Sequence, residues 1–141
     1  SCDIGLHMAK KRLQWLNRTL LLGPYLVLTL EEWEDDIIRK KLNVQFEKQP
    51  YDGRCLTLER GNELTIIVGL RNYINKTRVE VTALLVHEVD HAIEQVFEKM
   101  GEKYPGSETS AYLKQNMFTY LYENLEKRVV FENDILVRLK E

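Results

Sequence analysis

The sequence His87-Glu88-Val89-Asp90-His91 lies inside a long helix-forming stretch. It is the part of the chain around which the rest of the fold is expected to be arranged. Residues four apart share one face of an α-helix, so both imidazoles can reach one metal ion without bending the backbone. Glu88 projects about 100° around the helix from His87 and can approach a water at that ion as a general base. The pattern therefore predicts a zinc site. Two histidines four apart also occur on ordinary polar helix faces, so the surrounding residues have to support the motif.

The neighbouring residues predict one helix from Val79 to Met100. Thr77 and Glu80 form a T-x-x-E capping box at its start, and Gly101 stands where a left-handed residue ends a helix. Apolar residues at three- and four-residue spacing predict a buried stripe almost opposite the two histidines. Such a helix fits between a sheet and a second helix. The stripe consists of Val86, Val89, Ile93, Val96, Phe97 and Met100.

A catalytic zinc site takes a third protein ligand and leaves its fourth position for water. Pro105-Gly106 breaks the chain, and Ser107 is the expected N-cap of a helix from Glu108 to Lys127. Glu108 is in line with the apolar stripe of this helix, and a carboxylate on a buried face is costly unless it is paired or binds a metal. This alignment favours Glu108 as the third ligand over the alternative, in which the residue only complements the helix dipole. The stripe consists of Ala111, Phe118, Tyr122 and Leu125.

Other side chains are weaker ligand candidates. Glu94 and Glu98 belong to the motif helix itself, and Glu102 follows it too closely to turn back. Cys55 is a distant possibility for a fourth ligand, which would close the site and make it structural. A catalytic site also needs a donor for the oxyanion, for which Tyr112 is the candidate. The alternatives to Tyr112 are Tyr104 and Tyr120, and for each of the three a half-buried position in the core is favoured over the donor role.

Several motifs together resemble the gluzincin group of zinc metallopeptidases. The wider pattern resembles more closely a group of small metallopeptidase-like proteins of phages and prophages. The resemblance spans about Lys11 to Phe118, whereas the segment after Lys127 matches nothing recognised, and the third histidine of the metzincin pattern is absent. It implies a minimal zincin-like fold, a zinc site made by His87, His91 and Glu108 with Glu88 catalytic, and a sheet edge that binds peptide as an extra strand. It rests on Lys11-Arg12-Leu13-Gln14-Trp15-Leu16-Asn17-Arg18, Leu22-Gly23-Pro24, Ala83-Leu84-Leu85-Val86-His87-Glu88, Asp90-His91-Ala92, Gly101-Glu102, Ser107-Glu108 and Ala111-Tyr112.

The remaining segments predict an α+β scaffold in the order helix, strand, helix, hairpin, motif helix and glutamate helix. Tyr25 to Leu30 is strand-like, and Glu31 to Leu42 is a helix with Thr29 or Leu30 near its N-cap. Its expected buried side is Trp33, Ile37 and Ile38. Cys55–Glu59 and Leu64–Leu70 form a hairpin around Arg60-Gly61-Asn62-Glu63, in a sheet covered on at least one face. The segment from Val129 to Glu141 either extends the last helix or forms a short strand.

Composition limits the function classes. The chain has 141 residues, which suits one domain, and a net charge of −2, which argues against binding nucleic acid through its phosphates. No stretch is long and apolar enough to span a membrane, so no membrane partner is expected. Only Cys2 and Cys55 are present, so a disulfide framework is not expected. His7-Met8 marks residues 1–7 as a tag remnant and 8–141 as a single zincin-like domain. A cytoplasmic location follows, in the host cell where the protein is phage-encoded.

Two functions remain open on these grounds. The first is a metallopeptidase with one Zn²⁺ per chain that hydrolyses a peptide or protein substrate, with Glu88 as base. The second is a non-catalytic binding protein of phage origin that keeps the zincin fold and acts on a host component, with its zinc structural or absent. The sequence favours the enzyme, because Glu88 has no role in a closed structural site. It leaves the oligomeric state open.

Overall fold

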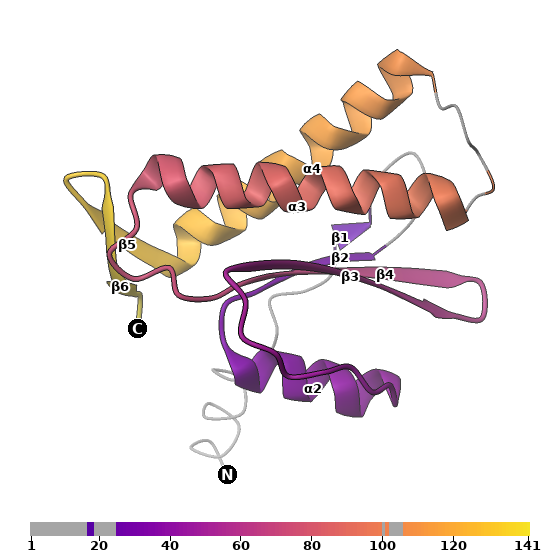
Figure 1. Ribbon diagram of the computed structural model, residues 1–141, viewed down its shortest axis with the longest axis horizontal. Coiled ribbons are helices and arrows are strands. Elements are labelled where there is room, and N and C mark those ends of the chain that lie inside the picture. Colours follow the sequence, from indigo (N-terminus) through magenta and orange to yellow (C-terminus); the bar gives the residue numbers. More distant parts are fainter. Residues whose placement is uncertain (1–16, 19–24, 100, 102–105) are drawn as a thin grey trace, which may run out of the picture.

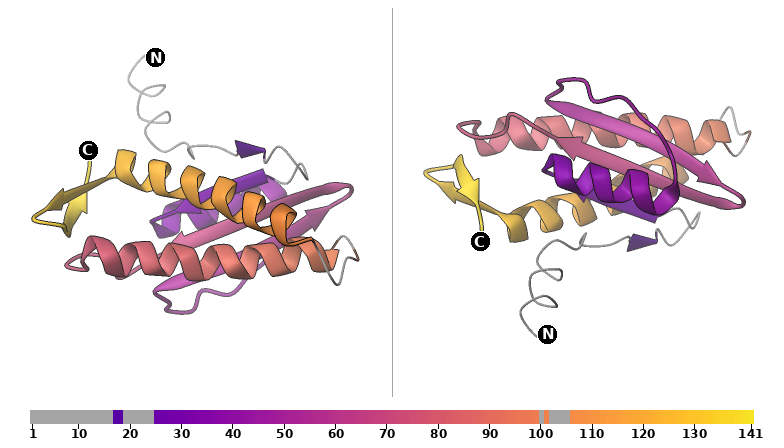
Figure 2. Two further views of the ribbon diagram at one scale, coloured as in Figure 1. Left: turned by 90° about the horizontal axis from the view of Figure 1, so that it is seen from above. Right: turned by 90° about the horizontal axis from the view of Figure 1, so that it is seen from below.

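A computed structural model describes residues 17–18, 25–99, 101 and 106–141 of the chain. Figure 1 shows a sheet between two helical layers, with α2 (Glu32–Leu42) on one face. The other face is covered by α3 (Arg78–Lys99) and α4 (Ser107–Arg128), which lie side by side when seen from above in Figure 2. The predicted α+β class is confirmed.

The sheet has four described strands in the order β1-β2-β4-β3. The central pair is β2 (Tyr25–Thr29) and β4 (Glu63–Leu70), which run parallel. The edges are β1 (Asn17–Arg18) and β3 (Gly53–Arg60), each antiparallel to its neighbour. The predicted hairpin is therefore confirmed as β3–β4, with longer strands than the sequence indicated. Its turn uses Gly61 at φ 61°, a left-handed conformation that glycine adopts without a Cβ clash.

Both faces of the two central strands are buried, which explains their nearly continuous apolar sequence. Leu28 and Val68 belong to the large core shared with α3 and α4. Val27 and Ile67 point to the opposite face, where they pack with Ile38 of α2 in a smaller cluster. The sheet is therefore the middle layer of the molecule.

Helix α3 forms as the sequence predicts. The backbone N–H of Thr77 donates to Glu80 Oε1 at 3.0 Å, and the N–H of Glu80 donates to Thr77 Oγ1 at 3.1 Å. Gly101 has φ 73° at the other end, and Met100 lies outside the described residues. One expected stripe residue is wrong, since Val86 is 54% exposed. The buried side instead consists of Val81, Leu85, Glu88, Val89, Ala92, Ile93, Val96 and Phe97.

Helix α4 differs more from its prediction. Its N-cap is Gly106 and not Ser107, and it buries a different side. Ala111 is exposed, whereas Phe118 and Tyr122 are only half-buried, so of the expected stripe only the last residue is fully buried. The buried side begins two residues later than expected, at Leu113 instead of Ala111. Two residues correspond to about 200° around a helix, so Glu108, which is in line with Ala111, faces outside and is exposed. The buried-face argument for Glu108 is therefore wrong. The buried residues are Leu113, Met117, Leu121, Asn124 and Leu125.

The remaining segments complete the fold. Helix α2 has Glu31 as its N-cap, one or two residues later than expected, and Trp33 and Ile37 are half-buried. The C-terminal segment takes the strand alternative, as β5 (Val129–Glu132) and β6 (Ile135–Leu139). The expected N-terminal helix lies outside the described residues, apart from the two residues of β1.

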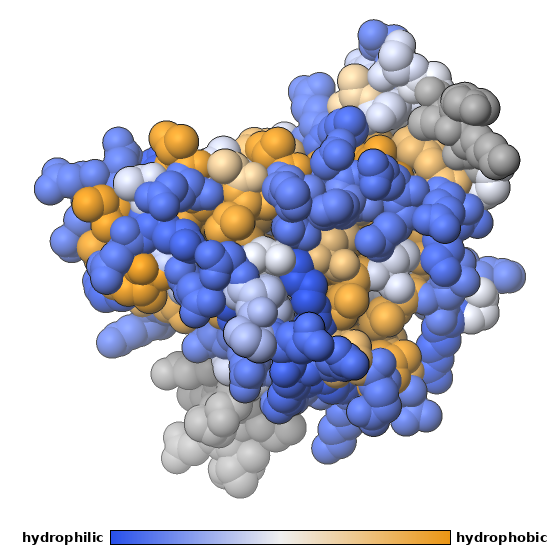
Figure 3. Space-filling model, viewed as in Figure 1, coloured by the Kyte–Doolittle hydropathy of each residue, from blue (hydrophilic) through white to orange (hydrophobic). Residues whose placement is uncertain are grey.

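The surface is mainly polar on the face shown in Figure 3, with apolar side chains both at the end where β5 and β6 lie and in a patch right of the centre. Val79 is 76% exposed and Ile135 is 38% exposed. Among the described helices, none is both long and apolar enough to cross a membrane.

An ion pair between Glu34 and Arg128 predicts a test of this fold. The two side chains are 1% and 14% exposed, with Oε1 to Nη2 at 2.6 Å. We expect Arg128→Ala to lower the free energy of unfolding by about 3–5 kcal/mol, because it leaves a buried carboxylate unpaired. The measurement is urea denaturation, with the exposed Arg138→Ala as control. Glu34→Gln combined with Arg128→Leu should recover most of the loss; a cost for Arg128→Ala no larger than the control would contradict the role of the pair.

Candidate metal centre

The two motif histidines lie together on the exposed side of α3, facing away from the sheet. His87 Nε2 and His91 Nε2 are 3.1 Å apart. Their ring centroids are 4.7 Å apart and the ring planes meet at 76°. The helix that the capping box starts thus brings the two imidazoles into contact, as their four-residue spacing predicted.

The separation of the two Nε2 atoms fits a shared ligand. Two nitrogens bound to one tetrahedral zinc at about 2.0–2.1 Å lie roughly 3.3 Å from each other. The observed 3.1 Å is close to that value, and it also fits a hydrogen bond in which one Nε2–H donates to the other ring. Metal binding requires both rings to carry their proton on Nδ1 instead.

Glu88 points in a different direction from the histidines, toward strand β3. It is 4% exposed and belongs to the buried side of α3. A Cβ placed on Gly53 would lie 3.0 Å from Glu88 Oε1, so this glycine allows the carboxylate to pack directly against the strand. Burial raises the pKa of Glu88, and the neighbouring charges of His87 and His91 lower it. A carboxylate with a raised pKa is a better proton acceptor than an exposed one.

A groove of about 530 Å³ runs beside the histidines between α3 and α4. Lys114 Nζ lies 3.1 Å from Asp90 Oδ1, an ion pair that links the two helices beside the motif. Both members of the pair are well exposed, so it adds little stability, but it places a positive charge near the imidazoles. The other lining residues are Val86, His87, Val89 and His91 on α3, and Gln115 and Phe118 on α4.

Glu108 is not brought to the histidines. It precedes Lys114 by six residues, or about 9 Å along the helix axis, and does not line the groove. It lies at the end of α4 that rises away from the sheet in Figure 1. Within the described ranges, no three His, Cys, Asp or Glu side chains are grouped so as to hold a metal ion. The structure therefore assembles two of the three predicted ligands.

The other candidates are also spread out. Tyr112 is 65% exposed and does not line the groove, whereas Tyr120 is half-buried against the core. Glu94 and Glu98 are exposed on α3. Tyr104 and Glu102 lie outside the described residues. Neither described tyrosine is placed beside the histidine pair.

Sequence reasoning missed the partners of Glu88, which come from β3. Gly53 and Cys55 alternate with Arg54 and Leu56, which face the side of α2, so Gly53 and Cys55 lie on the face of β3 toward α3. Thr57 continues this face, and its hydroxyl bonds Gln95 of α3. Only the isolated glycine at the start of the strand hinted at such a close approach.

The site has to be interpreted from its own residues. No family model, curated protein or solved structure matches this chain. What the described residues bring together is a pair of exposed imidazoles, a buried carboxylate one residue along the helix, and a groove beside them. The imidazole pair is a set of ligands that suits a transition metal, whereas the Glu88 carboxylate faces β3 on the buried side of the same helix.

The environment of Cys55 predicts an unreactive thiol. Burial raises its pKa to about 12, and the negative charge of Glu88 contributes. Thiolate is the reactive form, so at pH 8 we expect modification by a thiol reagent to be at least about 100-fold slower than in the urea-unfolded chain. The measurement uses a Cys2→Ser background, so that only Cys55 reacts. Adding Glu88→Gln should increase the rate, because it removes a charge that opposes thiolate formation; equal rates in folded and unfolded protein would contradict this environment.

Proposed function

We propose that this chain is a zinc-dependent peptidase in which His87 and His91 hold the metal ion and Glu88 is the general base. The observation that carries the proposal is the pair of exposed Nε2 atoms 3.1 Å apart on a capped helix. Imidazole is a ligand suited to zinc, and the glutamate that follows the first histidine is placed as in the H-E-x-x-H pattern.

The chain's own residues support a proton-transfer role for Glu88. Zinc, when bound, supplies Lewis acidity toward an amide carbonyl and toward water. Glu88 takes a proton from the attacking water and delivers it to the departing amine nitrogen. Burial raises the pKa of Glu88, which strengthens the carboxylate as a base. Its packing against Gly53 turns the carboxylate toward β3, so in this proposal Glu88 rotates toward the histidine side when substrate and water bind.

The third ligand in this proposal is Glu108. Its carboxylate is exposed in the first turn of α4, so it can bind a metal without losing a structural partner in the core. To reach the histidines, this turn of α4 has to approach α3 when zinc binds. The fourth position stays open for water, as catalysis requires.

The proposed substrate is a peptide laid along β3. Among the described strands, β3 pairs only with β4, so its other edge offers backbone donors and acceptors. A peptide that pairs with this edge passes Gly53, which touches the Glu88 carboxylate. Backbone pairing gives affinity with little dependence on sequence, and side-chain pockets then determine specificity.

A second candidate is a non-catalytic binding protein. Two observations favour it. Glu88 is only 4% exposed, and Glu108 does not line the groove beside the histidine pair. In that case the histidines bind metal without an activated water, or bind none. Zinc binding and hydrolysis therefore have to be measured separately.

Zinc affinity is the first test. We expect about one zinc per chain in the wild type, its loss in His91→Ala, and a more than 100-fold weaker affinity in Glu108→Ala, since even partners of ligands contribute about 10–100-fold. The measurement is competition with a chromophoric chelator. Glu123→Ala, which removes an exposed carboxylate from the same helix, should match the wild type. Unchanged affinity in His91→Ala would remove the site, and unchanged affinity in Glu108→Ala would remove the third ligand.

Hydrolysis is the second test. We expect zinc-loaded protein to cleave members of a fluorogenic peptide library, and Glu88→Gln to keep its zinc but lose at least about 100-fold in rate, as expected for removal of a general base. Asp90→Asn is the matched control, because Asp90 is exposed in the same motif and pairs only with Lys114 among the ion pairs of the described chain. Cleavage that survives in Glu88→Gln would take the base role from Glu88. Zinc-loaded wild type without cleavage would favour the binding protein.

A further inference from the structure

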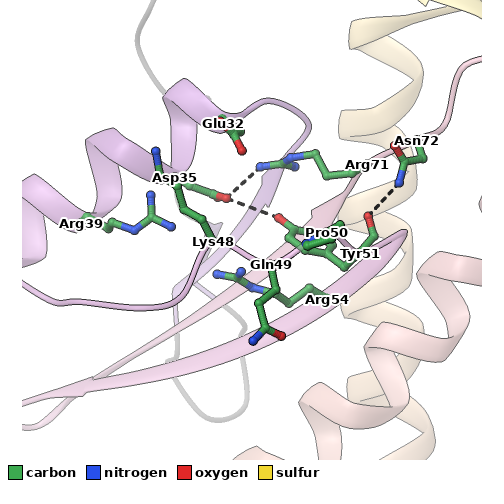
Figure 4. A pocket seen from close by; sticks show the side chains of 10 residues that line it. All are labelled: Glu32, Asp35, Arg39, Lys48, Gln49, Pro50, Tyr51, Arg54, Arg71 and Asn72. Atoms are coloured by element: carbon green, nitrogen blue, oxygen red, sulfur yellow. Dashed lines mark hydrogen bonds and ion pairs between the residues drawn. The ribbon is translucent and has the colours of Figure 1, made fainter.

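A second polar site lies on the opposite face of the sheet from the histidines. A pocket of about 340 Å³ opens between α2, the segment that leads into β3, and the residues after β4. Figure 4 shows that side chains from these three segments point into it, with Asp35 near the centre. The pocket was not signalled by any sequence motif.

Three guanidinium groups line the pocket. They belong to Arg39 of α2, Arg54 of β3 and Arg71, which follows β4. Arg39 and Arg71 are largely buried, with side chains 13% and 15% exposed. Lys48 adds a fourth, exposed cation at the rim.

Two aromatic rings hold these guanidinium groups in place. The Arg39 guanidinium lies 4.1 Å and that of Arg54 4.8 Å from the centre of the Phe46 ring. Arg54 and Arg71 also lie over Tyr51, at 4.9 Å and 5.3 Å. These cation–π contacts restrict the guanidinium groups before any ligand arrives, which reduces the entropy lost on binding.

The arginines differ in their carboxylate partners. Arg71 Nη2 lies 2.8 Å from Asp35 Oδ2, and Arg39 Nη1 lies 2.7 Å from Asp36 Oδ1. Arg54 donates from Nη1 to the carbonyl oxygen of Glu47 at 2.9 Å. Within the part of the chain that the structure describes, no carboxylate pairs with Arg54, and its buried Nη2 has no hydrogen-bond partner. Arg54 is therefore the cation whose charge is left for something else.

Asp35 has a carboxylate oxygen that lacks a hydrogen-bond donor. This residue is 5% exposed, and its Oδ2 receives bonds from Arg71 at 2.8 Å and from the Tyr51 hydroxyl at 3.3 Å. Its Oδ1 is buried and receives no bond from the described residues. Leaving a buried charged donor or acceptor unmatched costs about 1–3 kcal/mol or more. The pocket thus lacks an acceptor at Arg54 and a donor at Asp35.

We propose that this pocket binds a small oxyanion, a phosphate or carboxylate compound, that also carries a hydroxyl or ammonium donor. Its anionic oxygen pairs with the Arg54 guanidinium, and its donor group pairs with the Asp35 carboxylate. Arg54 Nη2 and Asp35 Oδ1 are both buried in this structure, so these side chains turn toward the ligand when it binds. A pocket volume of about 340 Å³ lies at the lower end of the range for small-molecule sites, so the space suits a small metabolite. Arg is suited to both anions because its planar donors match phosphate and carboxylate oxygens.

This proposal does not depend on the peptidase proposal. Arg54 and Gly53 are neighbours in β3, but their side-chain directions are opposite, so one faces the pocket and the other touches Glu88. The pocket and the histidines are therefore separated by the sheet. Either site can be removed without changing a residue of the other.

The test is isothermal titration at low ionic strength with inorganic phosphate, glycolate and acetate as probes, with chloride as the non-specific anion. We expect phosphate, glycolate or both to bind at least tenfold more tightly than chloride. Glycolate should bind more tightly than acetate, because its hydroxyl supplies the donor for Asp35. Phosphate binding alone identifies a phosphate compound as the ligand class, and glycolate binding alone identifies a hydroxy acid.

The matched variants are Arg54→Gln and Arg60→Gln. Arg60 lies on the same face of the same strand but is exposed at its far end, outside the pocket. We expect Arg54→Gln to weaken binding of the responding probe at least tenfold and Arg60→Gln to leave it unchanged. Thermal unfolding with and without the probe checks folding, since a bound anion raises Tm in the wild type and in Arg60→Gln but not in Arg54→Gln. No binding by any probe, or equal loss in both variants, would overturn the proposal.

Discussion

The buried carboxylate of Glu34 links the three layers of the molecule through its hydrogen bonds. It accepts two hydrogen bonds from Arg128, at 2.6 Å and 3.0 Å, and one from the backbone N–H of Leu30 at 3.0 Å. Arg128 also donates to the carbonyl oxygen of Leu28 at 3.4 Å. The end of α4 on one face of the sheet is thereby joined to the start of α2 on the other, past the end of β2. A buried ion pair is weak evidence for stability, but here it requires one arrangement of the layers, because any other leaves the charges unpaired.

Strand β3 has a comparable role for the two candidate sites. Its alternate side chains face opposite layers, so Gly53 and Cys55 meet α3 while Arg54 and Leu56 face the side of α2. A one-residue slip in the pairing of β3 with β4 would exchange these faces. It would bring a guanidinium against Glu88 and remove the glycine that allows the close approach. The register set by the turn at Gly61 therefore determines the surroundings of both sites.

What the sequence predicted well depended on local signals. The capping box of α3, the β3–β4 hairpin and the histidine pair each involve residues close in the chain. Helix α4 was misjudged because it has apolar residues on several sides, and contacts with α3 and the sheet select Leu113, Met117 and Leu121 over Ala111 and Phe118. The same choice places Glu108 outside. The oxyanion pocket could not be predicted, because its residues come from α2, β3 and the end of β4, and only the tertiary fold brings them together.

The burial of Glu88 is the part of the motif that packing alone does not explain. The exposed imidazoles cost the fold little, so ordinary surface chemistry would tolerate them. Glu88, by contrast, is 4% exposed on a helix side otherwise lined by apolar residues such as Leu85 and Ala92. An apolar side chain there would add buried surface, and it would avoid the desolvation that raises the carboxylate's pKa. Positions where a sequence breaks its own packing pattern are where function is expected, and this one lies inside the histidine motif beside a glycine that accommodates it.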